Sequence, residues 1–213
     1  MNSENIPVAS SPAPRFEFRS FGQDFEKANW RMARLSVPVP EKLWVRTSDE
    51  IYILSWNSDI NNVKIRDGKM DIKTLVQTTD GLEQWNPVMK GEFPMHIDLL
   101  KNEVIAALHV QVPDWHKEYC SLDEFLGLVN LHPQLLSARI HKTRYAYMVN
   151  NTISETGIVL INGAKVFTVN SESTVIEDVK RTLRDTGLEG IENINYLQAI
   201  KRVTGMINKP LAN

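Results

Sequence analysis

Alternating polar and apolar positions mark several short strands along the chain. Charged and aromatic side chains alternate over residues 15–19, and the same alternation recurs over residues 63–66, directly before Asp67-Gly68. A period of two is typical of a strand with one apolar face, and Asp-Gly favours a tight hairpin turn. We therefore predict strands over 15–19 and 63–66, with a return strand over 69–77.

The remaining pattern alternates between further strands and capped helices. Strands are predicted over 50–56 and 138–149, and a hairpin around Asn162-Gly163 joins 157–161 to 165–169. Serine or threonine followed three residues later by glutamate forms a capping box, which opens a helix. The predicted helices run over 24–35, from the capping box at Ser121 to 131, from a second capping box at Thr174 to a C-cap at Gly187, and over 195–203.

The order of these elements lacks the regular strand–helix–strand alternation of parallel sheets. It predicts an α+β fold with a mainly antiparallel sheet, and a barrel with helices packed outside fits this order. No linker divides the chain, so we expect one domain over 15–205. Residues 1–14, rich in Ser, Pro and Asn, are predicted to be a disordered tail, and residues 206–213 a C-terminal tail.

Composition narrows the function classes. Of the 213 residues, 42% are hydrophobic and 23% charged, which is ordinary for a globular chain. The 24 Lys and Arg against 26 Asp and Glu give a net charge of −2, so we expect no duplex nucleic acid as partner, although a local basic site fits. The single cysteine excludes an intrachain disulfide. Because no apolar run approaches the ~20 residues of a membrane helix and no secretory signal is recognisable, we expect a cytoplasmic protein without a membrane partner.

Cationic side chains share one face of several predicted strands. Residues two apart on a strand point to the same side. In a barrel these cations would point inward, where they would need water or an anionic guest, and guanidinium groups suit phosphate oxygens. Periodicity alone leaves open the alternative of a solvated outer face. The residues concerned are Arg15, Arg19, Lys64, Arg66, Lys73, Lys142 and Arg144.

Four motifs in order carry a family resemblance. These are Arg15-Phe16-Glu17-Phe18-Arg19, Val63-Lys64-Ile65-Arg66 with its return strand Asp71-Ile72-Lys73-Thr74, His141-Lys142-Thr143-Arg144-Tyr145-Ala146-Tyr147, and the strand and helices of 163–199. Over roughly 15–204 the chain resembles the CYTH, or triphosphate tunnel metalloenzyme, superfamily. The resemblance implies an antiparallel eight-stranded tunnel-like barrel lined by basic residues, with acidic residues binding Mg²⁺ or Mn²⁺.

The sequence departs from this family in its acidic positions. Arg15 stands where the family's opening motif begins with glutamate, and Asn162, Thr168 and Asn170 stand where later strands carry acids. Glu17 is the one metal ligand that the resemblance identifies. A single carboxylate beside an arginine is a poor site for a hard dication, so the departures count against Mg or Mn as a cofactor.

The resemblance implies a catalytic role for Glu17 and Lys73, and ligand binding by the seven cations named above. We expect a basic tunnel that binds inorganic triphosphate, polyphosphate or an organic triphosphate, with weak or altered metal-dependent catalysis. One alternative is an active Mg- or Mn-dependent triphosphatase, acting on phosphoanhydride bonds, or an adenylyl cyclase, in which Glu172, Glu103 or Asp71 joins Glu17. The other is a protein-binding adaptor with a vestigial tunnel. The sequence does not decide between a monomer and a homodimer.

Overall fold

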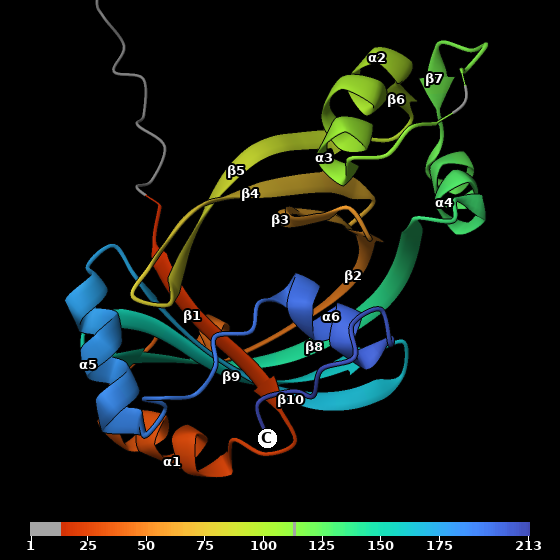
Figure 1. Cartoon of the computed structure of the whole chain (residues 1–213). Coiled ribbons are helices and arrows are strands. Elements are labelled where there is room, and N and C mark those ends of the chain that lie inside the picture. The colour runs from red at the N-terminus through yellow and green to blue at the C-terminus, as the bar shows by residue number, and fades with distance from the viewer. Residues whose placement is uncertain (1–13, 113) are drawn as a thin grey trace, which may run out of the picture.

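A computed structural model describes residues 14–112 and 114–213. Within these residues, eight antiparallel strands close into a barrel in the order β1-β10-β9-β8-β2-β3-β4-β5 (Figure 1). The α+β class, and the eight-stranded antiparallel barrel with outer helices that the resemblance implies, are confirmed. The strands are β1 (Phe16–Gly22), β2 (Val45–Ser55), β3 (Ser58–Arg66), β4 (Lys69–Thr79), β5 (Leu82–Glu92), β8 (Leu135–Val149), β9 (Thr152–Ile161) and β10 (Ala164–Ser173).

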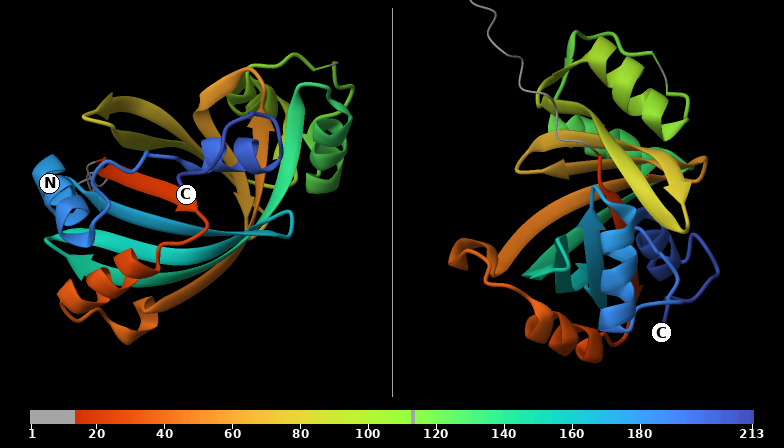
Figure 2. Two further views of the ribbon diagram at one scale, coloured as in Figure 1. Left: turned by 60° about the horizontal axis from the view of Figure 1, so that its bottom comes forward. Right: turned by 90° about the vertical axis from the view of Figure 1, so that its left-hand side faces the viewer.

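The helices surround the barrel in two groups, with α6 at one end (Figures 1 and 2). Helices α1 and α5 pack together on one side, and a group of short helices with the two-stranded β6–β7 sheet lies on the other. The bounds are α1 (Glu26–Leu35), η1 (Glu41–Leu43), β6 (Met95–His96), α2 (Ile97–Leu99), η2 (Leu100–Ile105), α3 (Ala106–Leu108), β7 (Tyr119–Cys120), α4 (Leu122–Leu131), α5 (Ile176–Thr186) and α6 (Tyr196–Val203). None of the helices in the described ranges is long and apolar enough to cross a membrane.

Turn and cap chemistry set the local boundaries largely as predicted. Both hairpins form, and their turns at Asp67 and Asn162 have positive φ values of 53° and 49°. The capping box at Ser121 forms in full and opens α4, and Gly187 ends α5 in the left-handed conformation. The capping box predicted at Thr174 is wrong, because α5 begins after Val175 without a side-chain cap from the described residues.

Of the two predicted tails, the structure describes only the C-terminal one in full. Residues 1–13 of the predicted N-terminal tail lie outside the described residues, and Pro14 is exposed. The segment 206–213 lies against β1, where the backbone N–H of Ala212 donates to the carbonyl of Phe21 at 2.9 Å. The side chain of Asn213 accepts from the backbone N–H of Gln23 at 2.6 Å. This segment therefore covers an edge of β1 that β5 leaves unpaired beyond Glu17.

The inward-facing side chains change from charged to apolar along each strand. On β8 they run from Arg144 and Lys142 to Ile140 and Ala138, with the same order on β1 from Glu17 to Phe21. The apolar ends pack against α6, which contributes buried side chains such as those of Tyr196, Leu197 and Ile200. The barrel is thus filled and closed at this end by its own C-terminal helix, and a polar hollow remains toward the other end.

Candidate functional site

The polar part of the barrel interior is a cavity of about 490 Å³. Among the described residues, nine cationic side chains and five carboxylates line it, an excess of four positive charges. The cations are Arg15, Arg19, Arg46, Lys64, Arg66, Lys73, Lys90, Lys142 and Arg144, and the carboxylates are Glu17, Glu50, Asp71, Glu155 and Glu172. Because inward positions repeat every second residue, each strand contributes its charges to the cavity from one face.

Three of these carboxylates share one wall of the cavity. Glu17 on β1 lies directly opposite Glu172 on β10, and Glu155 on β9 lies opposite Asn170, two residues from Glu172. Burial raises the pKa of Glu172, and the neighbouring Glu17 raises it further. This wall is therefore acidic within a cavity that is basic as a whole.

An arginine pairs with each carboxylate of this wall. Arg15 donates to Glu172 at 3.1 Å, and Arg19 donates to Glu17 at 2.7 Å. Glu155 accepts from Arg46 and lies 3.8 Å from Arg144. The fixed positive charges thus stand next to the oxygens that a metal ion would need.

The floor of the cavity contains a second cluster, centred on Glu50. Its carboxylate lies 2.7 Å from the Nζ atom of Lys142, 3.3 Å from that of Lys64 and 3.7 Å from a guanidinium nitrogen of Arg66. The Glu50 side chain is 1% exposed. Burial alone would raise the pKa of Glu50, but the charges of Lys142 and Lys64 lower it to about 2.

Aromatic rings separate this cluster from the apolar end of the barrel. Tyr52 and Tyr196 stack at 5.4 Å, and Phe21 meets Tyr196 edge-on at 4.9 Å. Lys142 lies over the Tyr196 ring at 3.8 Å from its centroid, and its Nζ also donates to the Tyr52 hydroxyl at 2.9 Å. These contacts satisfy a buried ammonium through a carboxylate, a hydroxyl and a π face.

Polar atoms without partners concentrate at this cavity. In the described part of the chain, eight buried side-chain atoms have no hydrogen-bond partner, and six of them belong to residues that line the cavity. They include the Nε donors of Arg46 and Arg144 and the Tyr196 hydroxyl. Since burying an unpaired polar group is costly, this lining is suited to a polar guest.

All seven cations predicted from the sequence line this cavity together with Glu17. They differ in burial. Arg19 is buried in its ion pair with Glu17 at the acidic wall, and Lys64 and Lys142 are buried in ion pairs with Glu50 at the floor. Arg15 and Arg66 keep side-chain exposures of 45% and 40%, and Arg144 keeps 20%. Lys73 reaches the cavity from β4 and is partly buried. Their ligand-binding roles, and the catalytic roles of Glu17 and Lys73, stay predictions.

Sequence reasoning missed part of the lining. Arg46 and Glu50 point to the same face of β2. The strand was predicted to begin only at residue 50, so Arg46 was not recognised as a strand residue on the same face as Glu50. Glu155 lies opposite Asn170, so its position depends on cross-strand register, which a single strand does not reveal. Glu172 and Asp71 do line the cavity, whereas Glu103 lies on η2 and does not.

The donor set does not fit a divalent metal as it stands. The carboxylates of the acidic wall each hold an arginine, and residues 14–112 and 114–213 contain no group of three His, Cys, Asp or Glu side chains able to hold a metal ion. A hard cation prefers several free carboxylate oxygens. Mg or Mn binding would require the arginines to move away.

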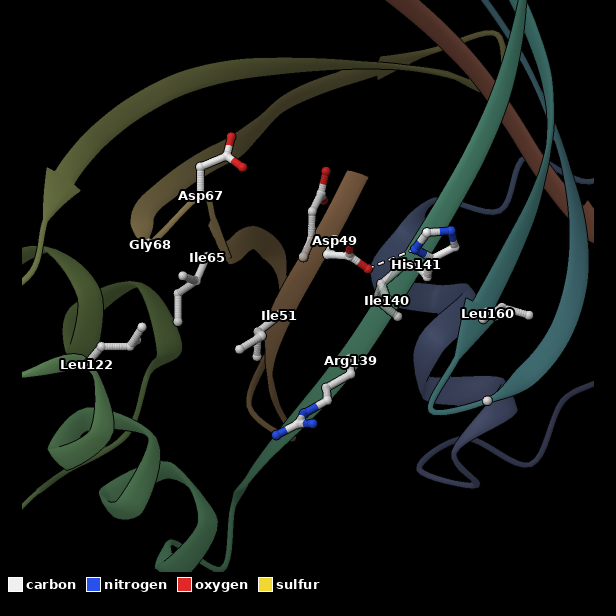
Figure 3. Close-up of a pocket in the computed structure, with 12 residues that line it drawn as sticks. Asp49, Ile51, Ile65, Asp67, Gly68, Leu122, Arg139, Ile140, His141 and Leu160 are labelled. Carbon is white, nitrogen blue, oxygen red and sulfur yellow. Dashed lines mark hydrogen bonds and ion pairs between the residues drawn. The ribbon is translucent and has the colours of Figure 1, made fainter. Parts of the chain in front are cut away.

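A second hollow of about 490 Å³ lies on the outer face of the barrel, near the start of α4 (Figure 3). Its lining is mainly apolar, with Ile51, Leu122 and Leu160 among its residues, and Asp49 and His141 lie 2.8 Å apart at its edge. It contains none of the residues predicted to bind ligand. The chemistry suggested by the sequence is therefore confined to the barrel interior.

Comparison with known proteins gives structural similarity at low sequence identity. A Bacillus halodurans protein described as a candidate adenylate cyclase is 10% identical with a TM-score of 0.49, covering 87% of this chain and 96% of that one. A Hippeastrum protein, described as a candidate adenylyl cyclase with a dominant triphosphatase activity, is 10% identical with a TM-score of 0.46, covering 90% and 95%. PH1012 of Pyrococcus horikoshii is 13% identical with a TM-score of 0.46, covering 87% and 99%.

No family model and no curated protein matches the sequence. At TM-scores below 0.5 the structural similarities carry no functional weight, and the barrel is established by its own strand pairing.

Proposed function

We propose that the barrel cavity binds a triphosphate-bearing or polyphosphate ligand and that it does so without a divalent metal. The observation that carries the proposal is the lining itself, in which cations outnumber carboxylates by nine to five and arginines pair with the acidic wall. Guanidinium groups bind phosphate oxygens in a bidentate manner, and fixed cations neutralise phosphate charge as a metal would.

The side chains available to such a ligand lie toward the open part of the cavity. Arg15, Arg46 and Arg66 keep about two fifths of their surface exposed, and Arg144 keeps 20%. The Nε donors of Arg46 and Arg144 have no partner among residues 14–112 and 114–213, which favours an acceptor from a bound ligand. A phosphate oxygen would be such an acceptor, and the exposed arginines can reorient to it at little cost.

The test is calorimetric titration of tripolyphosphate in EDTA and again in Mg²⁺ or Mn²⁺. We expect binding in EDTA that weakens as salt is added, because the contacts are largely ionic. No heat and no thermal stabilisation in EDTA would refute metal-free binding. Inorganic sulfate at equal ionic strength is the control for a general salt effect.

A second candidate function is metal-dependent hydrolysis of a triphosphate. The observation that favours it is the shared wall of Glu17, Glu155 and Glu172, which would offer three carboxylates if the arginines turned to the phosphates. Phosphate release from tripolyphosphate with Mn²⁺, lost in Glu17→Gln, would establish this activity. Release no faster than in buffer would leave binding as the function.

A further inference from the structure

Glu50 is the most buried carboxylate of the cavity, and it lies where the inner cations converge. Lys142 approaches it from β8 and Lys64 from β3, at 2.7 and 3.3 Å. Ser48 also donates to its second oxygen at 3.3 Å. A carboxylate surrounded by cations in this way has the surroundings that a bound phosphate group would have.

The position of Glu50 along the barrel is as informative as its contacts. It lies opposite Arg66 in the register of β2 with β3, and Arg66 reaches toward the open part of the cavity with 40% of its side chain exposed. On the inner side, the next inward residue of β2 is Tyr52, one of the aromatic residues that separate the Glu50 cluster from the apolar end of the barrel. Glu50 therefore stands between the accessible arginines and the end of the cavity.

The inner cations are buried in their ion pairs, whereas the outer ones keep part of their side chains exposed. The Lys142 side chain is 4% exposed and bound to Glu50, Tyr52 and the Tyr196 ring. The low pKa of Glu50, about 2, keeps its charge in place at all ordinary pH values. A phosphate chain entering from the open side would meet a fixed negative charge before it reached Lys142.

We infer that Glu50 occupies the innermost phosphate position of the cavity and thereby limits how many phosphate groups of a chain the barrel can hold. The inference rests on the proposed function and adds a specificity-determining residue to it. The outer arginines take the terminal phosphates, and Glu50 pairs with the lysines that a longer chain would otherwise use.

The test compares the chain-length dependence of binding in Glu50→Gln with that in the unchanged protein. Pyrophosphate, tripolyphosphate and tetrapolyphosphate are titrated in EDTA. We expect less than a threefold gain in affinity from tripolyphosphate to tetrapolyphosphate for the unchanged protein, and a gain of at least tenfold for Glu50→Gln. Glu172→Gln is the matched control, because it removes one carboxylate from the outer wall and should favour all chain lengths by a similar factor.

A uniform effect of Glu50→Gln on all three ligands, or no effect, would overturn the inference and leave the proposed function intact if the unchanged protein binds. If neither protein binds any of the ligands, both ideas fail. Should Glu50→Gln not fold, Glu50→Gln combined with Lys64→Met removes one of the two lysines that lose this carboxylate and keeps Lys142 and Arg66. The tenfold gain is expected there as well, and its absence would count against the inference.

Discussion

The buried cluster around Glu50 makes a quantitative prediction about stability. Lowering the pKa of Glu50 from its ordinary 4.5 to about 2 corresponds to ~3 kcal/mol, because each pKa unit is worth about 1.4 kcal/mol. Breaking a buried ion pair by removing one partner costs about 3–5 kcal/mol in other proteins. Glu50→Gln should therefore reduce the free energy of unfolding at neutral pH by ~3 kcal/mol.

The pH dependence gives the sign of the effect. A carboxylate whose folded pKa is depressed stabilises the fold above its unfolded pKa, and this contribution is lost as the pH falls toward the folded value. The difference between the unchanged protein and Glu50→Gln should thus be full above pH 4.5 and should shrink between pH 4.5 and about 2. Urea unfolding followed by tryptophan fluorescence, repeated across this range, measures it.

A surface pair supplies the control for this experiment. Glu92 pairs with Lys69 at exposed strand ends, where solvent screens the charges, so Glu92→Gln should leave the free energy of unfolding almost unchanged. Two results would refute the reasoning: a Glu50→Gln protein as stable as the unchanged one at pH 7, or a stability difference that does not decrease as the pH falls from 4.5.

Three further outcomes are expected. The double variant Arg66→Ala and Arg144→Ala should bind tripolyphosphate at least ~100-fold more weakly, because each substitution removes a charged hydrogen-bond donor from the cavity. Its circular dichroism spectrum should be unchanged, and full affinity would contradict the assigned site. Gly157→Ala should lose ~1–3 kcal/mol in thermal unfolding, because its Cβ would meet a β8 backbone oxygen at 2.6 Å, whereas Gly127→Ala, with open space in α4, should not destabilise. Ser121→Ala should cost ~1 kcal/mol by removing the capping box of α4, and equal melting temperatures would speak against it.

Local chemistry explains which parts of the fold could be predicted from the sequence. Turn residues such as Asp67 and Asn162, and the capping box at Ser121, act within a few positions, so their patterns sufficed. β5 and the short helices α2 and α3 depend on packing against the barrel, and no strong local pattern marks them. Leu35, the last residue of α1, is 40% exposed, because the helix turns the face of Ala28 and Met32 toward the barrel.

The sequence predicted the cations of the candidate site but not most of the carboxylates that balance their charge. Same-face spacing on single strands identified pairs such as Lys64 with Arg66, and all of these reach the cavity. Which carboxylate faces which cation depends on the register between strands, as between Glu50 on β2 and Arg66 on β3. Register is a property of the assembled barrel, so the acidic partners were found only in the structure.

This balance explains how the barrel can fold around so many positive charges. Unpaired buried cations would be too costly, and each buried cation of the cavity has a carboxylate within ion-pair distance, as Lys142 has Glu50 and Arg19 has Glu17. The surplus of positive charge therefore falls on side chains near the open end, such as Arg66 and Lys90, which solvent can reach. The barrel can therefore fold without a bound anion. An anionic ligand would meet the surplus cations at the open end of the cavity, where it enters.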